Sequence, residues 1–218
     1  MKIAIFDSGV GGLSFRKALE DKFPEAKIVY IEDKENIPYG DKTPQKLLEL
    51  TLPIFKKIDK DKFDAVLIAC NTVTTNIIND LREVISTPLV GVEPMLKPAS
   101  NITKTGKIAV CATSATLTSK RYEWLKENFA VDIKVIEPNC NDWAYMIENN
   151  RKNELKLKDM IEDLKTKDVD VLVLGCTHYH WIEKELKLLA GTSIDVIQPT
   201  KPVIDQLDRV IRDNSQTQ

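Results

Sequence analysis

The chain has 218 residues, 43% of them hydrophobic and 29% charged, which is enough apolar material for one large domain or two small ones. The formal net charge of −2 comes from acids and bases that alternate along the chain, so we expect no nucleic-acid partner. Apolar runs stay well below the ~20 residues that cross a bilayer. The first acidic residue, Asp7, comes too early in the chain for the apolar stretch of a signal peptide. We therefore expect a cytoplasmic protein with no membrane partner.

Short β-branched runs alternate with amphipathic segments along the whole chain. Strands are expected to begin near Lys2, Lys27, Asp64 and Pro88, and again near Lys107, Asp132, Asp170 and Ser193. Amphipathic helices are predicted between them, one of them capped by Thr43 with Pro44 in its first turn, and a last one at residues 200–218. This alternation is typical of an α/β fold in which helices cover a mostly parallel sheet.

The second set of strands repeats the first at a nearly constant distance. Residues 2–5 match residues 107–110, 105 positions later, and residues 64–70 match residues 170–176, 106 positions later. Buried strands resemble one another by chance, but a common offset over four strands indicates an internal duplication. We predict two pseudo-symmetric α/β domains, each with a mostly parallel four-stranded sheet flanked by helices. Residues 1–94 with the helix 200–218 form the first, and residues 95–199 form the second.

A glycine-rich turn, Asp7-Ser8-Gly9-Val10-Gly11-Gly12, follows the first strand. It lacks the third glycine of a dinucleotide fingerprint and the Gly-Lys-Ser/Thr ending of a phosphate loop. Free backbone N–H groups at the start of the next helix favour an anion such as a carboxylate. A plain tight turn is an equally good interpretation.

Two of the four cysteines end equivalent strands of the two halves. Cys70 is followed by Asn71 and Thr72, and Cys176 is followed by Thr177 and His178. At such a corner the dipole of the next helix is expected to lower the pKa of the thiol. No Cys-x-x-Cys pair occurs, so we expect no metal site, and we interpret Cys111 and Cys140 as small buried hydrophobic residues.

Ligands of open α/β sheets bind beyond the carboxyl ends of the strands, so two facing halves would bring both thiols into one cleft. Such a pair suits an amino-acid racemase, because one thiol removes a proton from one face of a carbon while the other returns a proton to the opposite face. Asp7 and His178 are not duplicated, and we expect each to assist one thiol. A structural hydrogen bond is the alternative for His178 and our interpretation of His180.

Four segments resemble the signatures of glutamate racemases, in the cofactor-independent aspartate/glutamate racemase family: residues 7–13, 38–40, 69–72 and 175–179. The resemblance runs from Met1 to about Pro202. It implies interconversion of L- and D-glutamate for peptidoglycan synthesis, without cofactor or metal, with Cys70 and Cys176 as proton carriers. It also implies a glutamate site made of Asp7, Ser8, Pro38, Tyr39, Gly40, Asn71, Thr72, Thr177 and His178, with Thr116 as a further contact and Glu148 near the second thiol.

The chain departs from the family pattern at residues 32–36, 73–75 and 141–146, which leaves the substrate open. A racemase of aspartate or another small amino acid is one alternative, because one methylene contributes only ~1–3 kcal/mol of discrimination. A one-cysteine isomerase or decarboxylase of dicarboxylic acids is another, and a non-catalytic module that binds a carboxylate is a third. The resemblance alone suggests a homodimer.

Overall fold

The computed structural model describes residues 1–215 and contains two four-stranded sheets in which every strand pair is parallel. The strand orders are β2-β1-β3-β4 and β6-β5-β7-β8, so the two halves share one topology. The strands are β1 (Lys2–Asp7), β2 (Lys27–Glu32), β3 (Ala65–Ile68), β4 (Leu89–Gly91), β5 (Lys107–Cys111), β6 (Lys134–Ile136), β7 (Val171–Leu174) and β8 (Asp195–Ile197). The predicted α/β fold with two parallel sheets is confirmed.

Helices connect the strands and cover both sheets. Those around the first sheet are α1 (Leu13–Lys22), the short 3-10 helix η1 (Lys34–Asn36), α2 (Pro44–Lys60), α3 (Asn71–Val84) and α10 (Thr200–Ser215). Those around the second are α4 (Leu96–Ile102), α5 (Ser114–Leu117), α6 (Lys120–Phe129), α7 (Trp143–Glu148), η2 (Lys152–Glu154), α8 (Leu157–Thr166), η3 (Thr177–Ile182) and α9 (Glu183–Ala190). Helix α10 contacts α1, β3 and β4, as expected for a helix that belongs with the first sheet. Residues 216–218 of the predicted last helix lie outside the described residues.

Local sequence explains where these elements begin and which faces they bury. The Thr43 hydroxyl accepts a hydrogen bond from the Lys46 N–H at 3.3 Å, which caps α2 as predicted. Successive side chains of β1 point to opposite faces of the sheet: Ile5 packs in the cluster that contains residues of α1 and α10, whereas Phe6 packs against Phe55 of α2. The first sheet is therefore buried on both faces, as its continuous apolar strands indicate.

The duplication extends to the amino ends of the strands. The Asp64 carboxylate accepts a hydrogen bond from the backbone N–H of Lys2 at 2.6 Å. In the second half, Asp170 accepts from the N–H of Lys104 at 2.6 Å and from the Thr103 hydroxyl at 2.5 Å. An aspartate before the third strand of each half thus stabilises the backbone near the start of the first strand.

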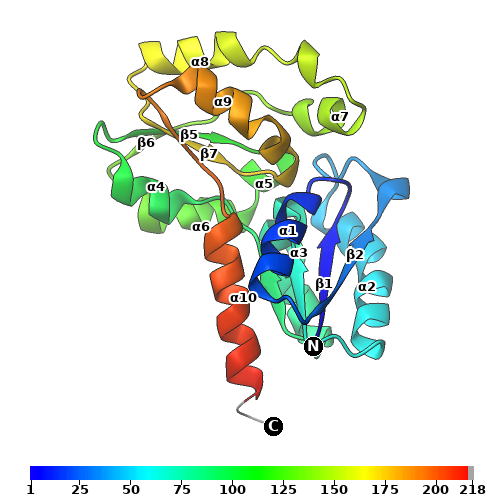
Figure 1. Ribbon diagram of the computed structural model, residues 1–218. Coiled ribbons are helices and arrows are strands. Elements are labelled where there is room, and N and C mark those ends of the chain that lie inside the picture. The colour runs from blue at the N-terminus through cyan, green and yellow to red at the C-terminus, as the bar shows by residue number, and fades with distance from the viewer. Residues whose placement is uncertain (216–218) are drawn as a thin grey trace.

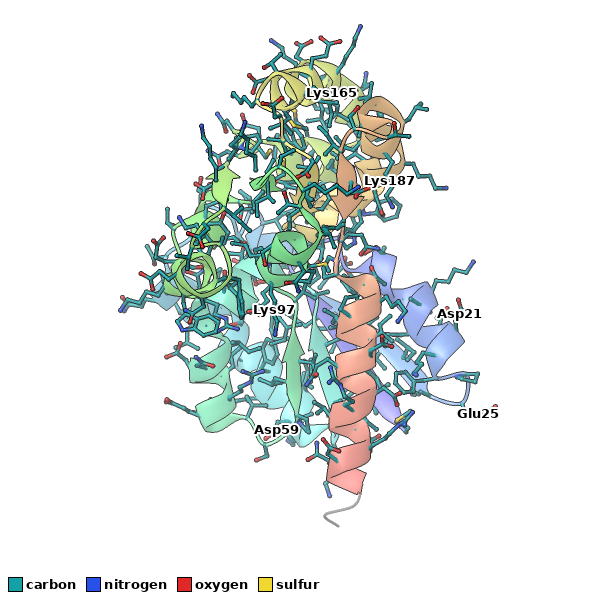
Figure 2. The ribbon with its side chains drawn as sticks, turned by 90° about the vertical axis from the view of Figure 1, so that its left-hand side faces the viewer. Asp21, Glu25, Asp59, Lys97, Lys165 and Lys187 are labelled. Carbon is teal, nitrogen blue, oxygen red and sulfur yellow. The ribbon has the colours of Figure 1, made fainter. Side chains whose placement is uncertain are left out.

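The two halves lie one above the other, and α10 extends along the half built around β1 (Figure 1). Figure 2 shows the same arrangement from the side, with the exposed Lys165 and Lys187 on the half that contains β5 and the exposed Asp21 and Glu25 on the other. Among the described helices, none combines the length and the apolar character needed to span a membrane.

Candidate active site

A cavity of about 300 Å³ opens between the two halves. Residues that directly follow strands of both sheets line it, including Ser8 after β1, Cys70 near the end of β3, and Cys176 near the end of β7. The carboxyl ends of the two sheets therefore share one cavity, and both thiols reach it. Of the residues singled out in the sequence, the cavity is lined by Ser8, Pro38, Tyr39, Gly40, Cys70, Asn71, Thr72, Glu148, Cys176, Thr177 and His178.

Asp7 and Thr116 lie behind the cavity wall and are not among its lining residues. The Asp7 carboxylate is fully buried and accepts hydrogen bonds from the backbone N–H of Gly12 at 2.5 Å and the Thr177 hydroxyl at 3.1 Å. Burial raises the pKa of Asp7 in spite of these bonds and the nearby His178. Thr116 accepts a hydrogen bond from Thr113, which does line the cavity, at 3.1 Å. In this arrangement Asp7 and Thr116 contact residues that line the cavity, and their direct contact with a ligand stays a prediction.

The first thiol, Cys70, lies at the N-terminus of α3 and is 5% exposed. Its Sγ donates a hydrogen bond to the Ser8 hydroxyl at 3.8 Å. Burial, and secondarily the negative charge of Asp7, raise the pKa of Cys70 above its ordinary value. The prediction that the helix dipole lowers this pKa is wrong for Cys70, because loss of solvation at this depth outweighs the dipole.

The second thiol, Cys176, has a different partner. Its Sγ lies 3.8 Å from Nδ1 of His178, and Nε2 of His178 lies 2.7 Å from Oε2 of Glu148. Burial disfavours the imidazolium, but the hydrogen bonds with Cys176 and Glu148 outweigh it and raise the pKa of His178 to about 10. The hydrogen bond from His178 in turn lowers the pKa of Glu148. His178 therefore carries a proton at neutral pH and donates it toward the sulfur.

The glycine-rich turn is shaped by the second half of the chain. A Cβ on Gly11 would lie 2.5 Å from the Thr177 hydroxyl oxygen and 2.7 Å from the backbone nitrogen of His178. A Cβ on Gly9 would lie 2.6 Å from Oε2 of Glu148. Oε2 of Glu148 also accepts a hydrogen bond from the N–H of Val10 at 3.2 Å. The N–H groups of Val10 and Gly12 donate to carboxylates of the protein itself, Glu148 and Asp7, and the binding of an anionic ligand at the turn stays a prediction.

Buried polar side chains, one of them unpaired, also line the cavity. Asn71 is 3% exposed, and neither its amide nitrogen nor its amide oxygen has a hydrogen-bond partner among the described residues. The Thr72 and Thr113 hydroxyls, one from each half, share a hydrogen bond of 2.9 Å. Buried amide groups without partners are rare because they lose their hydration, so Asn71 suits a polar ligand.

Several lining residues were missed in the sequence: Ile37, Asp41, Thr113, Asn141, Asp142, Ala144 and Tyr145. The repeat itself could have found Thr113, because it lies 105 positions after Ser8. The same offset could have found Asp142, Ala144 and Tyr145, because they lie 105 positions after Ile37, Tyr39 and Gly40.

Other side chains match the simpler interpretations. Cys111 and Cys140 are free and buried, and Nδ1 of His180 lies 2.8 Å from the Ser14 hydroxyl. Within residues 1–215, no group of three or more His, Cys, Asp or Glu side chains is arranged to hold a metal ion.

Comparison with known proteins gives consistent results. The glutamate racemase of Clostridium perfringens (strain SM101 / Type A) is 36% identical over 98% of this chain and 84% of its own length. The crystal structure of Escherichia coli glutamate racemase in complex with L-glutamate and the activator UDP-MurNAc-Ala has a TM-score of 0.86 and 26% identity, over 97% of this chain and 82% of that chain. The Francisella tularensis glutamate racemase in complex with D-glutamate has a TM-score of 0.81 and 25% identity, over 98% and 82%. A family model described as Asp/Glu/Hydantoin racemase matches residues 14–207, and the chain belongs to this family.

Proposed function

We propose that the protein is a glutamate racemase that interconverts L- and D-glutamate by passing the α-proton between Cys70 and Cys176, without a cofactor. One observation carries this proposal: two thiols from equivalent strand ends of the two halves line a single cavity. A one-base isomerase or decarboxylase has no use for the second thiol. Proteins of similar sequence and structure are named glutamate racemases, and two of the similar structures contain glutamate.

Hydrogen-bond donors in the cavity suit the carboxylates of the substrate. Asn71 presents an unpartnered amide, whereas the hydroxyls of Thr113 and Thr177, which also line the cavity, donate to Thr116 and Asp7. Removal of an α-proton pushes negative charge onto the α-carboxylate, so donors held in place before the reaction stabilise the transition state more than the ground state. The buried position of Asn71 makes such a bond stronger than in water.

The two thiols begin one direction of the reaction in different states. The raised pKa of Cys70 keeps it a neutral thiol, which is ready to give a proton. Nδ1 of His178 lies 3.8 Å from the Cys176 sulfur, so in this direction Cys176 is placed beside an imidazole when it takes the α-proton. One turnover moves a proton from the Cys70 sulfur to one face of the carbon, and moves the α-proton from the other face to Cys176. The reverse reaction starts from the opposite protonation of the pair.

We further propose that the product D-glutamate supplies peptidoglycan synthesis in the cytoplasm and that the active protein is a homodimer. These proposals are based on the family resemblance. The division into residues 1–94 with 200–218, and residues 95–199, is supported by the two sheets and by the contacts of α10 with the first.

The test is incubation of the purified protein with single-enantiomer glutamate in deuterated water. We expect loss of optical rotation together with deuterium at the α-carbon, and no such change with aspartate at equal enzyme concentration. Cys70→Ser and Cys176→Ser should each abolish racemisation, whereas Cys111→Ser, at a buried cysteine outside the cavity lining, should remain active. Full activity in either of the first two variants would rule out the two-thiol mechanism.

A further inference from the structure

Asn76 of α3 joins the two halves of the molecule. Its side-chain amide nitrogen, Nδ2, donates to the carbonyl oxygen of Thr72 at 2.9 Å, within the same helix. It also donates to the carbonyl oxygen of Ala115, in α5 of the other half, at 2.9 Å. The two hydrogens of the amide group match these two carbonyl acceptors, and the Thr75 hydroxyl oxygen is a longer contact at 3.3 Å. One side chain therefore links the helix that follows Cys70 to a segment of the second half.

The peptide groups of Ala115 are held by the first half on both sides. The Ala115 N–H donates to the carbonyl oxygen of Gly40 at 2.9 Å, while its carbonyl accepts from Asn76. Two residues earlier, Thr113 lines the cavity and shares a hydrogen bond with Thr72 across the two halves. The segment that carries Thr113 into the cavity is therefore attached to the first half at three points.

Asn76 itself is not among the residues that line the cavity. We infer that Asn76 is a positioning residue, which fixes the closed arrangement of the two halves at the cavity by holding the Ala115 segment against α3. This inference rests on the proposed racemase function. It concerns the distance between two reacting groups, one on each half, and an error of about 1 Å in such a distance can cost about 100-fold in rate.

The expected effect of removing this link is a shift of population. Asn76→Ala removes the donor to the Ala115 carbonyl, and one hydrogen bond of this kind corresponds to about a threefold to tenfold change in an equilibrium constant. Substrate must then restore the closed arrangement from its own binding energy, so KM should rise by the factor by which the closed fraction of the free protein falls, at most about tenfold. At saturating substrate kcat should stay within about twofold, because the bound state is closed again.

Asn76→Asp gives a sharper comparison, since it keeps the shape of the side chain but turns oxygen atoms toward two carbonyl oxygens. At neutral pH its KM should exceed that of Asn76→Ala. The ratio of the two KM values should fall toward one as the pH is lowered toward the pKa of the new carboxyl group, because a protonated carboxyl can donate.

Asn128→Ala is the matched control. Asn128 also donates from Nδ2 to the carbonyl of the residue four positions earlier, Trp124, at 2.8 Å, but on the exposed face of α6. Asn128→Ala therefore removes a side-chain bond to the carbonyl four residues earlier, as Asn76→Ala does, but it removes no bond to another element. Its KM should equal that of the wild type.

A second measurement separates this inference from the proposed function. Hydrogen exchange of the Ala115 amide, followed without substrate, should be faster in Asn76→Ala than in the wild type and unchanged in Asn128→Ala. The ratio of the exchange rates multiplied by the ratio of the KM values should be about threefold to tenfold, because a mainly closed protein shows the change in exchange and a mainly open one shows it in KM. If the wild type does not racemise glutamate, the proposed function fails and the exchange rates alone decide about Asn76. An Asn76→Ala variant in which neither the exchange rate at Ala115 nor KM changes would overturn the inference.

Discussion

Replacing Glu148 by glutamine should destabilise the protein in a pH-dependent way. The side chains of His178 and Glu148 are only 8% and 11% exposed, and they are joined by a hydrogen bond of 2.7 Å. A hydrogen bond to a charged group contributes about 1.5–3 kcal/mol and a neutral one about 0.5–1.5 kcal/mol. Glutamine can still accept from His178 and Val10, so Glu148→Gln should remove the difference, about 1–2 kcal/mol. This loss should lower the pKa of His178 from about 10 to about 9.

The pH window follows from the direction of the His178 shift. Its pKa in the folded protein, about 10, lies above the ordinary 6.5, so the stability that this group contributes is fully present below pH 6.5 and is lost as the pH rises through 10. The free energy of unfolding of Glu148→Gln should therefore be about 1–2 kcal/mol below that of the wild type at pH 7, and this difference should vanish above about pH 10.5.

Urea unfolding of the wild type and Glu148→Gln at pH 7 and pH 10.5 measures this difference directly. Glu154→Gln is the control, because Glu154 pairs with Arg151 on the surface at 2.6 Å and arginine keeps its charge throughout this range. Its difference from the wild type should not depend on pH. A deficit of Glu148→Gln that stays constant, or grows, between pH 7 and pH 10.5 would refute the assignment of a protonated, Glu148-bound His178.

Two further substitutions separate the site from the scaffold. Gly11→Ala places a methyl group 2.5 Å from the Thr177 hydroxyl oxygen and 2.7 Å from the backbone nitrogen of His178, so the halves must separate. Its kcat should fall at least about 100-fold while far-ultraviolet circular dichroism stays unchanged, and a kcat within twofold of the wild type would contradict the close contact. Thr43→Ala removes the cap of α2 and should lower the free energy of unfolding by about 1 kcal/mol with racemase activity unchanged, which chemical unfolding and the optical-rotation assay measure together.

The architecture was predictable because the two halves obey the same local rules. The apolar runs after Lys2 and Lys107 form the second strand in the order of each sheet, and the runs that end at Cys70 and Cys176 form the third. Strand ends at equivalent places in parallel sheets lie on the same edge, so the sequence alone predicts that both thiols face one cavity. The offset of the repeat carried more information than any single motif.

The electrostatics of the site were not predictable in the same way. The pKa of Cys70 depends on its burial and on Asp7, which is close in space but distant in sequence. Likewise, the contacts of Gly9 and Gly11 come from Glu148 and Thr177, on the opposite half. A glycine-rich turn has the same sequence pattern whether it leaves room for a ligand or for another part of the chain. Only the packing of the halves distinguishes these two cases.

The polypeptide passes from one half to the other twice, at residues 92–95 after β4 and at residues 198–199 before α10. A body attached at one point can rotate in any direction, whereas a body attached at two points turns about the line that joins them. These two connections therefore favour a swing of one half about that line over a twist of one half on the other. Each closing movement then returns the same pair of sulfur atoms to the same relative alignment.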